Sequence, residues 1–75
     1  MTLNQTAALR TLANDRFNGT SIFALTTIGL VPPAELTELE TAGLIAKFTR
    51  RYSRPAGLTV DCYRITAAGL RHVKP

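Results

Sequence analysis

Apolar residues follow a helical spacing along the first part of the chain. Thr2 with Gln5 forms a capping-box pattern, in which each side chain accepts a hydrogen bond from a free amide of the first turn. Asn18-Gly19 ends the pattern, because both residues tolerate a left-handed backbone. The spacing predicts a helix over Thr2–Phe17. Its expected buried stripe is Ala8, Leu9, Leu12, Ala13 and Phe17.

A short second helix is expected after Gly19. Thr20 or Ser21 is a suitable N-cap for a helix that runs to about Thr27, and Gly29 ends it. The expected core residues of this segment are Ile22, Phe23, Leu25 and Ile28.

A third helix is expected from Pro33 to Gly43, because proline suits the first helical position and glycine the C-terminal stop. The short connection before it is what a helix-turn-helix requires. The residues expected in its core face are Leu36, Leu39, Ala42 and Leu44. Those expected to face outward are Glu35, Thr37, Glu38, Glu40 and Thr41.

Beyond Gly43 the helical repeat gives way to alternation of apolar and polar residues, which is typical of strands. Two strands are predicted, Leu44–Tyr52 and Leu58–Ile65, joined by a turn over Ser53–Gly57. Thr66 is expected to cap a final short helix, Ala67–Val73. The pattern therefore predicts one α+β domain over residues 1–75.

The charge of the chain is divided unequally along its length. Residues 1–44 carry two basic residues against four acidic ones, a net charge of −2. Residues 45–75 carry seven basic residues against Asp61 alone, a net charge of +6. A basic half on a small domain favours nucleic acid or another anionic surface as partner.

Candidate chemistry is sparse. Cys62 is the only cysteine and His72 the only histidine, so an intrachain disulfide is excluded and a zinc site is not expected. We expect Cys62 to be a buried strand residue and His72 a solvated residue in the last helical turn. No combination of residues suggests a catalytic site, a metal site or a cofactor, so an enzyme is not expected. Without a membrane-spanning run or a signal-peptide pattern, the expected location is the cytoplasm.

Two motifs carry a resemblance to a known family. They are L-x-x-L-x-x-x-G-L-I over Leu36–Ile45 and Y-R-I-T-x-x-G over Tyr63–Gly69. Together with the order of elements they resemble the winged helix-turn-helix of the MarR and PadR groups of bacterial transcriptional regulators. The resemblance covers about Ala8–Val73. It implies three helices, a two-stranded β-wing, a short closing helix, and binding to double-stranded DNA.

By this resemblance the third helix would enter the major groove, where Thr37, Glu38 and Thr41 are its candidate contacts to DNA or to another partner. The three outward glutamates expected there would repel phosphates. The predicted wing is basic instead, and arginines in a wing reach the minor groove or flanking phosphates. The candidate DNA-binding residues of the wing are Lys47, Arg50, Arg51, Arg54 and Arg64.

Two functions follow from these observations. The first is a small DNA-binding transcriptional regulator, with a homodimer as one expected state. The alternative is a winged-helix interaction module, such as an inhibitor encoded by a phage or mobile element. It would bind a protein or nucleoprotein partner through its acidic third helix or basic wing. A purely structural role is also open for the wing charges, which protect an edge strand from aggregation.

Overall fold

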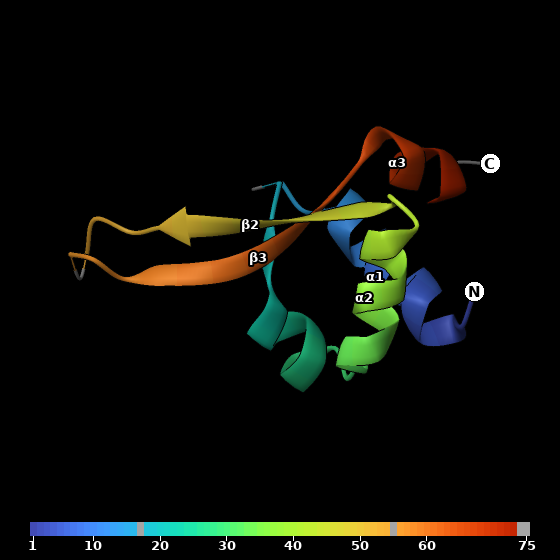
Figure 1. Cartoon of the computed structure of the whole chain (residues 1–75), viewed down its shortest axis with the longest axis horizontal. Helices are drawn as coiled ribbons and strands as arrows, with labels where there is room; N and C mark the ends of the chain where they lie inside the picture. Colours follow the sequence, from blue (N-terminus) through green and yellow to red (C-terminus); the bar gives the residue numbers. More distant parts are fainter. Residues whose placement is uncertain (17, 55, 74–75) are drawn as a thin grey trace.

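The computed structural model describes residues 1–16, 18–54 and 56–73, and it has a mixed α+β fold (Figure 1). The elements in chain order are α1 (Leu3–Ala13), β1 (Thr20–Ser21), the π-helix η1 (Ala24–Ile28), α2 (Pro33–Thr41), β2 (Ile45–Arg51), β3 (Thr59–Ile65) and α3 (Ala67–Val73).

Helix α1 begins with the predicted capping box. Thr2 Oγ1 accepts from the Gln5 amide at 3.0 Å, and Gln5 Oε1 accepts from the Thr2 amide at 2.9 Å. The helix ends at Ala13, earlier than predicted. Asp15 gives the reason, because its carboxylate accepts from the Gly19 amide and from Thr20 Oγ1 and so organises a loop in place of a further turn. The predicted end at Phe17 lies outside the described residues.

The second helical segment contains a π-helix, which has a larger radius than the predicted α-helix. Ser21 Oγ caps it by accepting from the Ala24 amide at 3.1 Å. The Gly29 amide then donates to the Ala24 carbonyl at 2.8 Å, an i→i+5 bond of a π-helix. The rotation per residue is smaller in a π-helix than in an α-helix. Apolar residues at α-helical spacing therefore do not all point toward the core. Phe23 and Ile28, which we expected in the core, are 67% and 76% exposed.

Helix α2 begins at Pro33 as predicted and buries Leu36 and Leu39. Gly43, with φ 78°, follows it in the left-handed conformation that glycine favours. Three expectations for this helix are wrong. Ala42 is exposed, because it is the C-cap residue beyond the last turn, and Glu35 and Glu40 are half-buried instead of facing outward.

The sheet has three antiparallel strands in the order β1-β3-β2, one more than the predicted hairpin. The seven pairs between β2 and β3 run from Ile45 opposite Ile65 to Arg51 opposite Thr59. Strand β1 adds two pairs on the other edge of β3, opposite Cys62 and Tyr63. A two-residue strand has no periodicity of its own, so the sequence pattern did not indicate it.

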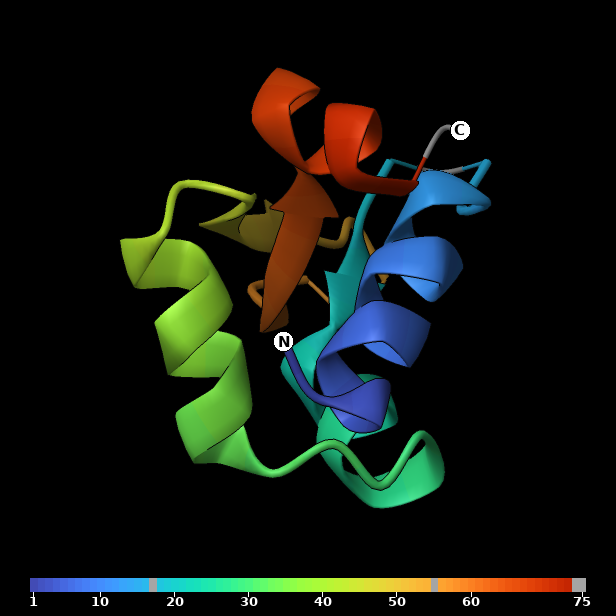
Figure 2. The ribbon, with the colours of Figure 1, turned by 90° about the vertical axis from the view of Figure 1, so that its right-hand side faces the viewer.

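The core lies where α1, α2 and α3 meet the inner ends of the strands (Figure 2). Cys62 is buried and His72 exposed, as predicted. The core residues are Ala8, Leu9, Leu12, Leu25, Val31, Leu36, Leu39, Leu44, Ile45 and Tyr63.

The two sequence motifs meet at Thr66. Its hydroxyl donates to the Gly43 carbonyl at 2.6 Å and accepts from the Gly69 amide at 3.1 Å, which confirms the predicted cap of α3. The Thr66 amide donates to the Leu44 carbonyl at 3.1 Å. A Cβ at Gly69 would collide with that same carbonyl, so only glycine lets α3 approach. Both motifs therefore have a structural role.

Candidate nucleic-acid interface

The β2–β3 hairpin projects from the helical body and gives the molecule its length, with dimensions of 40 × 22 × 19 Å (Figure 1). Beyond Arg51 the two chain segments form one further backbone hydrogen bond, in which the Tyr52 amide donates to the Leu58 carbonyl at 2.9 Å. Gly57 has a φ of 84° in the loop. The predicted wing cation Arg54 lies exposed in this loop, at the tip of the hairpin.

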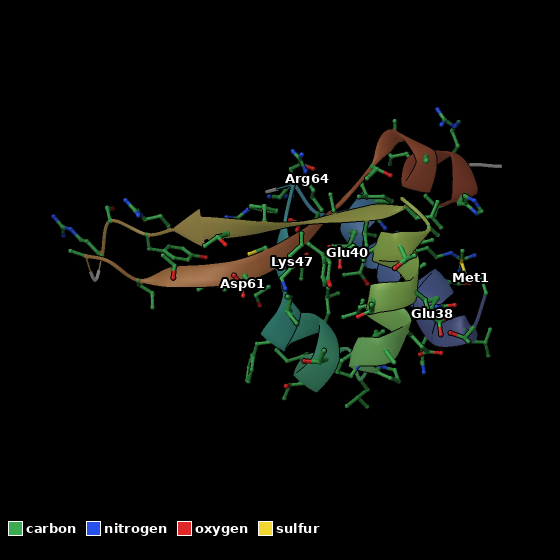
Figure 3. The ribbon with its side chains drawn as sticks, viewed as in Figure 1. Met1, Glu38, Glu40, Lys47, Asp61 and Arg64 are labelled. Atoms are coloured by element: carbon green, nitrogen blue, oxygen red, sulfur yellow. The ribbon has the colours of Figure 1, made fainter. Side chains whose placement is uncertain are left out.

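The register divides the remaining basic residues between the two faces of the hairpin. Side chains alternate along each strand, and directly opposed residues share a face. The first face carries Arg50 and Arg64, and the second carries Lys47 and Arg51. Figure 3 shows Lys47 and Arg64 on opposite sides of the sheet. The structure therefore does not bring the predicted wing residues together on one surface.

On the first face, Arg50 packs over an aromatic ring. Its Cζ lies 5.6 Å from the centroid of the Phe48 ring, within range of a cation–π interaction, and the Arg50 side chain is half-buried. Gly19 lies against the same pair. A Cβ there would overlap the Phe48 ring and approach an Arg50 guanidinium nitrogen to 2.8 Å. The sequence pattern indicated only a helix-ending role for Gly19, since a close contact with residues distant in the chain leaves no local signal.

On the second face, Lys47 and Arg51 are exposed and flank the cross-strand pair of Thr49 and Asp61. Thr49 Oγ1 donates to Asp61 Oδ1 at 3.1 Å. The carboxylate of Asp61, which lies among these basic residues, thus has one hydrogen-bond partner in Thr49.

The second face is also the one joined to α2. Tyr63 lies opposite Lys47 in the register, and its hydroxyl donates to Glu40 Oε1 at 3.1 Å. Burial raises the pKa of the Tyr63 hydroxyl above 10.0, and the hydrogen bond to Glu40 and the charge of that carboxylate raise it further. Lys47 and Arg51 therefore share a side of the sheet with this helix.

The exposed face of α2 is less acidic than expected. Ala34, Thr37, Glu38 and Thr41 are exposed. The Thr37 hydroxyl donates to the Pro33 carbonyl at 3.2 Å, and Glu38 Oε2 accepts from Gln5 Nε2 at 2.9 Å.

Gln5 is a structural residue whose full role the sequence did not reveal. It is 4% exposed, and its Nε2 also donates to the Glu35 carbonyl at 3.1 Å. The capping box identified its contact to Thr2, but the contacts to α2 are long-range. Gln5 thereby fixes α2 against α1.

Among residues 1–16, 18–54 and 56–73, no group of three or more His, Cys, Asp or Glu side chains gathers that could hold a metal ion. The helices in this described part of the chain are too short or too polar to cross a lipid bilayer.

The candidate interface is therefore a basic hairpin face beside a helix face whose exposed carboxylate is Glu38. Comparison of the chain with protein-family models, with curated proteins and with solved structures finds no match.

Proposed function

We propose that this chain is a winged helix-turn-helix protein that binds double-stranded DNA and regulates transcription. In this proposal α2 is the groove-binding helix and the β2–β3 hairpin is the wing. The order helix, strand, helix, helix, strand, strand supports it, as does the four-residue connection, residues 29–32, between η1 and α2.

The observation that carries the proposal is the shared side of α2 and the basic hairpin face. Lys47 and Arg51 lie on the hairpin face that carries Tyr63, which is bonded to Glu40 of α2. A duplex lying along that side meets Lys47 and Arg51 at its phosphates and Arg54 at the adjacent minor groove.

The exposed face of α2 is compatible with a groove. Thr37 and Thr41 offer hydroxyls to base edges, and their methyl groups and that of Ala34 suit the methyl group of thymine. Glu35 and Glu40 are half-buried, so Glu38 is the exposed carboxylate of α2, where the sequence suggested three.

The proposal predicts which cations carry DNA affinity. The double variant Lys47→Ala/Arg51→Ala should lower affinity for duplex DNA about 10-fold or more. Its slope of log affinity against log salt should become shallower by roughly 1.8, because two phosphate contacts are lost. Fluorescence anisotropy of a labelled duplex, between about 50 mM and 200 mM salt, measures both quantities.

The matched control is Arg64→Ala/Arg71→Ala, which removes the same charge. Arg64 lies on the opposite hairpin face, and Arg71 is in the last turn of α3. Its affinity should stay within about 3-fold of the wild type, the effect of two distant charges screened by salt. An equal loss in both doubles would contradict the assigned face, and no binding to any duplex at low salt would overturn the proposed function.

A further inference from the structure

Three large apolar side chains are exposed at the N-cap of η1, within η1 and in the turn after it. Phe23, Ile28 and Leu30, here called the η1 patch, are 67%, 76% and 72% exposed. Apolar side chains exposed to water do not stabilise an isolated chain.

A cavity of about 280 Å³ lies beside the η1 patch, between α1 and η1. Ile28 belongs to both the patch and the lining, while Phe23 adjoins lining residue Ala24 and Leu30 lies between two lining residues. The lining contains no ionisable side chain and is made of Ala7, Ala8, Thr11, Thr20, Ala24, Leu25, Ile28, Gly29 and Val31. At Ile28, therefore, a protruding apolar side chain borders an apolar recess.

The backbone at the η1 patch is strained. Leu30 has a φ of 57°, a left-handed conformation that is unfavourable for a residue with a branched side chain. It follows a π-helix, a geometry found often at functional sites. Glycine would relieve the strain at Leu30, yet the chain holds an exposed leucine there. An exposed leucine in this conformation marks the turn as a candidate interaction site.

We propose that the η1 patch and its cavity form a two-fold interface with a second copy of this chain. In a two-fold interface the same surface of both copies meets, so that surface must be complementary to itself. A surface that carries a protruding side chain beside a recess meets this condition. The side chains of Phe23, Ile28 and Leu30 of one copy would contact the cavity region of the other.

The distribution of charge selects a second copy as the occupant. Residues 18–34 contain no charged residue, although 19% of the chain is charged. Two chains of net charge +4 repel each other. At this segment they can meet without bringing like charges face to face. This inference does not depend on DNA binding.

The size of the patch sets the strength of the dimer. Its three side chains expose roughly 400 Å² of apolar surface, below the ~800 Å² per partner of a standard interface. The association should therefore be reversible, with a Kd on the order of 10 μM.

Sedimentation of the whole chain, from about 1 μM to about 1 mM, tests the inference. The wild type should convert from monomer to dimer across this range. The dimer should persist or strengthen with added salt, because the interface is uncharged and salt screens the repulsion between copies. DNA affinity would fall under the same change, so the two proposals can fail separately.

Ile28→Glu should raise the dissociation constant at least about 10-fold. Leu58→Glu is the matched control, because Leu58 is an exposed leucine of the hairpin and the substitution adds the same charge. It should leave dimerisation unchanged. Leu30→Gly removes a patch side chain while relieving backbone strain, so it should weaken the dimer with no loss of folding by circular dichroism.

Two results would overturn the inference. One is a wild type that stays monomeric up to about 1 mM protein. The other is a dimer that Leu58→Glu disrupts as strongly as Ile28→Glu and Leu30→Gly do, since the contact would then lie elsewhere.

Discussion

The hydroxyl of Tyr63 couples the strand to the helix through one hydrogen bond to Glu40, and this bond makes stability depend on pH. Burial and the Glu40 carboxylate raise the pKa of this hydroxyl above the ordinary 10.0. The unfolded chain therefore loses this proton at lower pH than the folded chain does. Proton release favours unfolding in that range, so the contribution is complete below about pH 10 and is lost as the pH rises further.

Tyr63→Phe should remove this pH dependence. The variant should be less stable by about 1 kcal/mol near neutral pH, because the bond to Glu40 is lost. Its free energy of unfolding should then fall less steeply than that of the wild type above about pH 10. Urea unfolding across this pH range measures both effects. Tyr52→Phe is the control, since Tyr52 is exposed, and parallel curves for wild type and Tyr63→Phe would contradict the prediction.

At the scale of elements, α1 and α2 are joined by the Gln5 side chain. Gln5→Ala should destabilise the fold by about 1–3 kcal/mol, because the Thr2 amide and the Glu35 carbonyl each lose a partner in a partly buried site. Asn4→Ala, at an exposed neighbouring position, should change stability by less than about 0.5 kcal/mol. Thermal and urea unfolding compare the two. Equal losses in both variants would show that the contacts of Gln5 contribute nothing of their own.

Local signals predicted the elements that are determined locally. The capping box at Thr2, the proline at Pro33, the glycine at Gly43 and the cap at Thr66 each appear in the structure where the sequence placed them. The π-helix was not predicted, because the sequence offered apolar residues at α-helical spacing. Thr26 Oγ1 donates to the Ile22 carbonyl at 2.9 Å within that segment, a side-chain bond that periodicity does not reveal.

The candidate site was predictable in composition but not in geometry. Adjacent strand residues such as Arg50 and Arg51 must point to opposite faces. Which face lies toward α2, however, is fixed by the contact of Tyr63 with Glu40, 23 residues apart in the chain. Likewise, the acidic face expected on α2 was altered by contacts of Glu38 and Glu40 to other elements. Charge can be counted along a chain, whereas its exposure depends on the tertiary fold.

At the scale of the whole molecule, the described loop residues 53–54 and 56–57 are exposed and do not belong to the core. Replacing residues 53–57 with Asn-Gly should give a two-residue turn between Tyr52 and Leu58, which are already bonded. The Tm should change by only about 4 °C or less.

The same replacement removes Arg54 and, under the proposed function, one cationic contact at the minor groove. The salt slope of DNA binding should become shallower by about 0.9. Calorimetry and anisotropy measure the two effects. A large loss of Tm would show that the loop supports the core, and an unchanged slope would remove Arg54 from the interface.

Strand β1 supports β3 only at Cys62 and Tyr63, so the sheet becomes a two-stranded ribbon beyond them. Such ribbons twist strongly and open locally at a lower free energy than a core strand does. The exposed cations Arg51 and Arg54 thus lie on the segment with the least backbone support. Ordering that ribbon on a partner would cost conformational entropy at the moment of binding. A third strand long enough to reach the hairpin tip would shift that cost to folding and would fix the twist before any partner arrived.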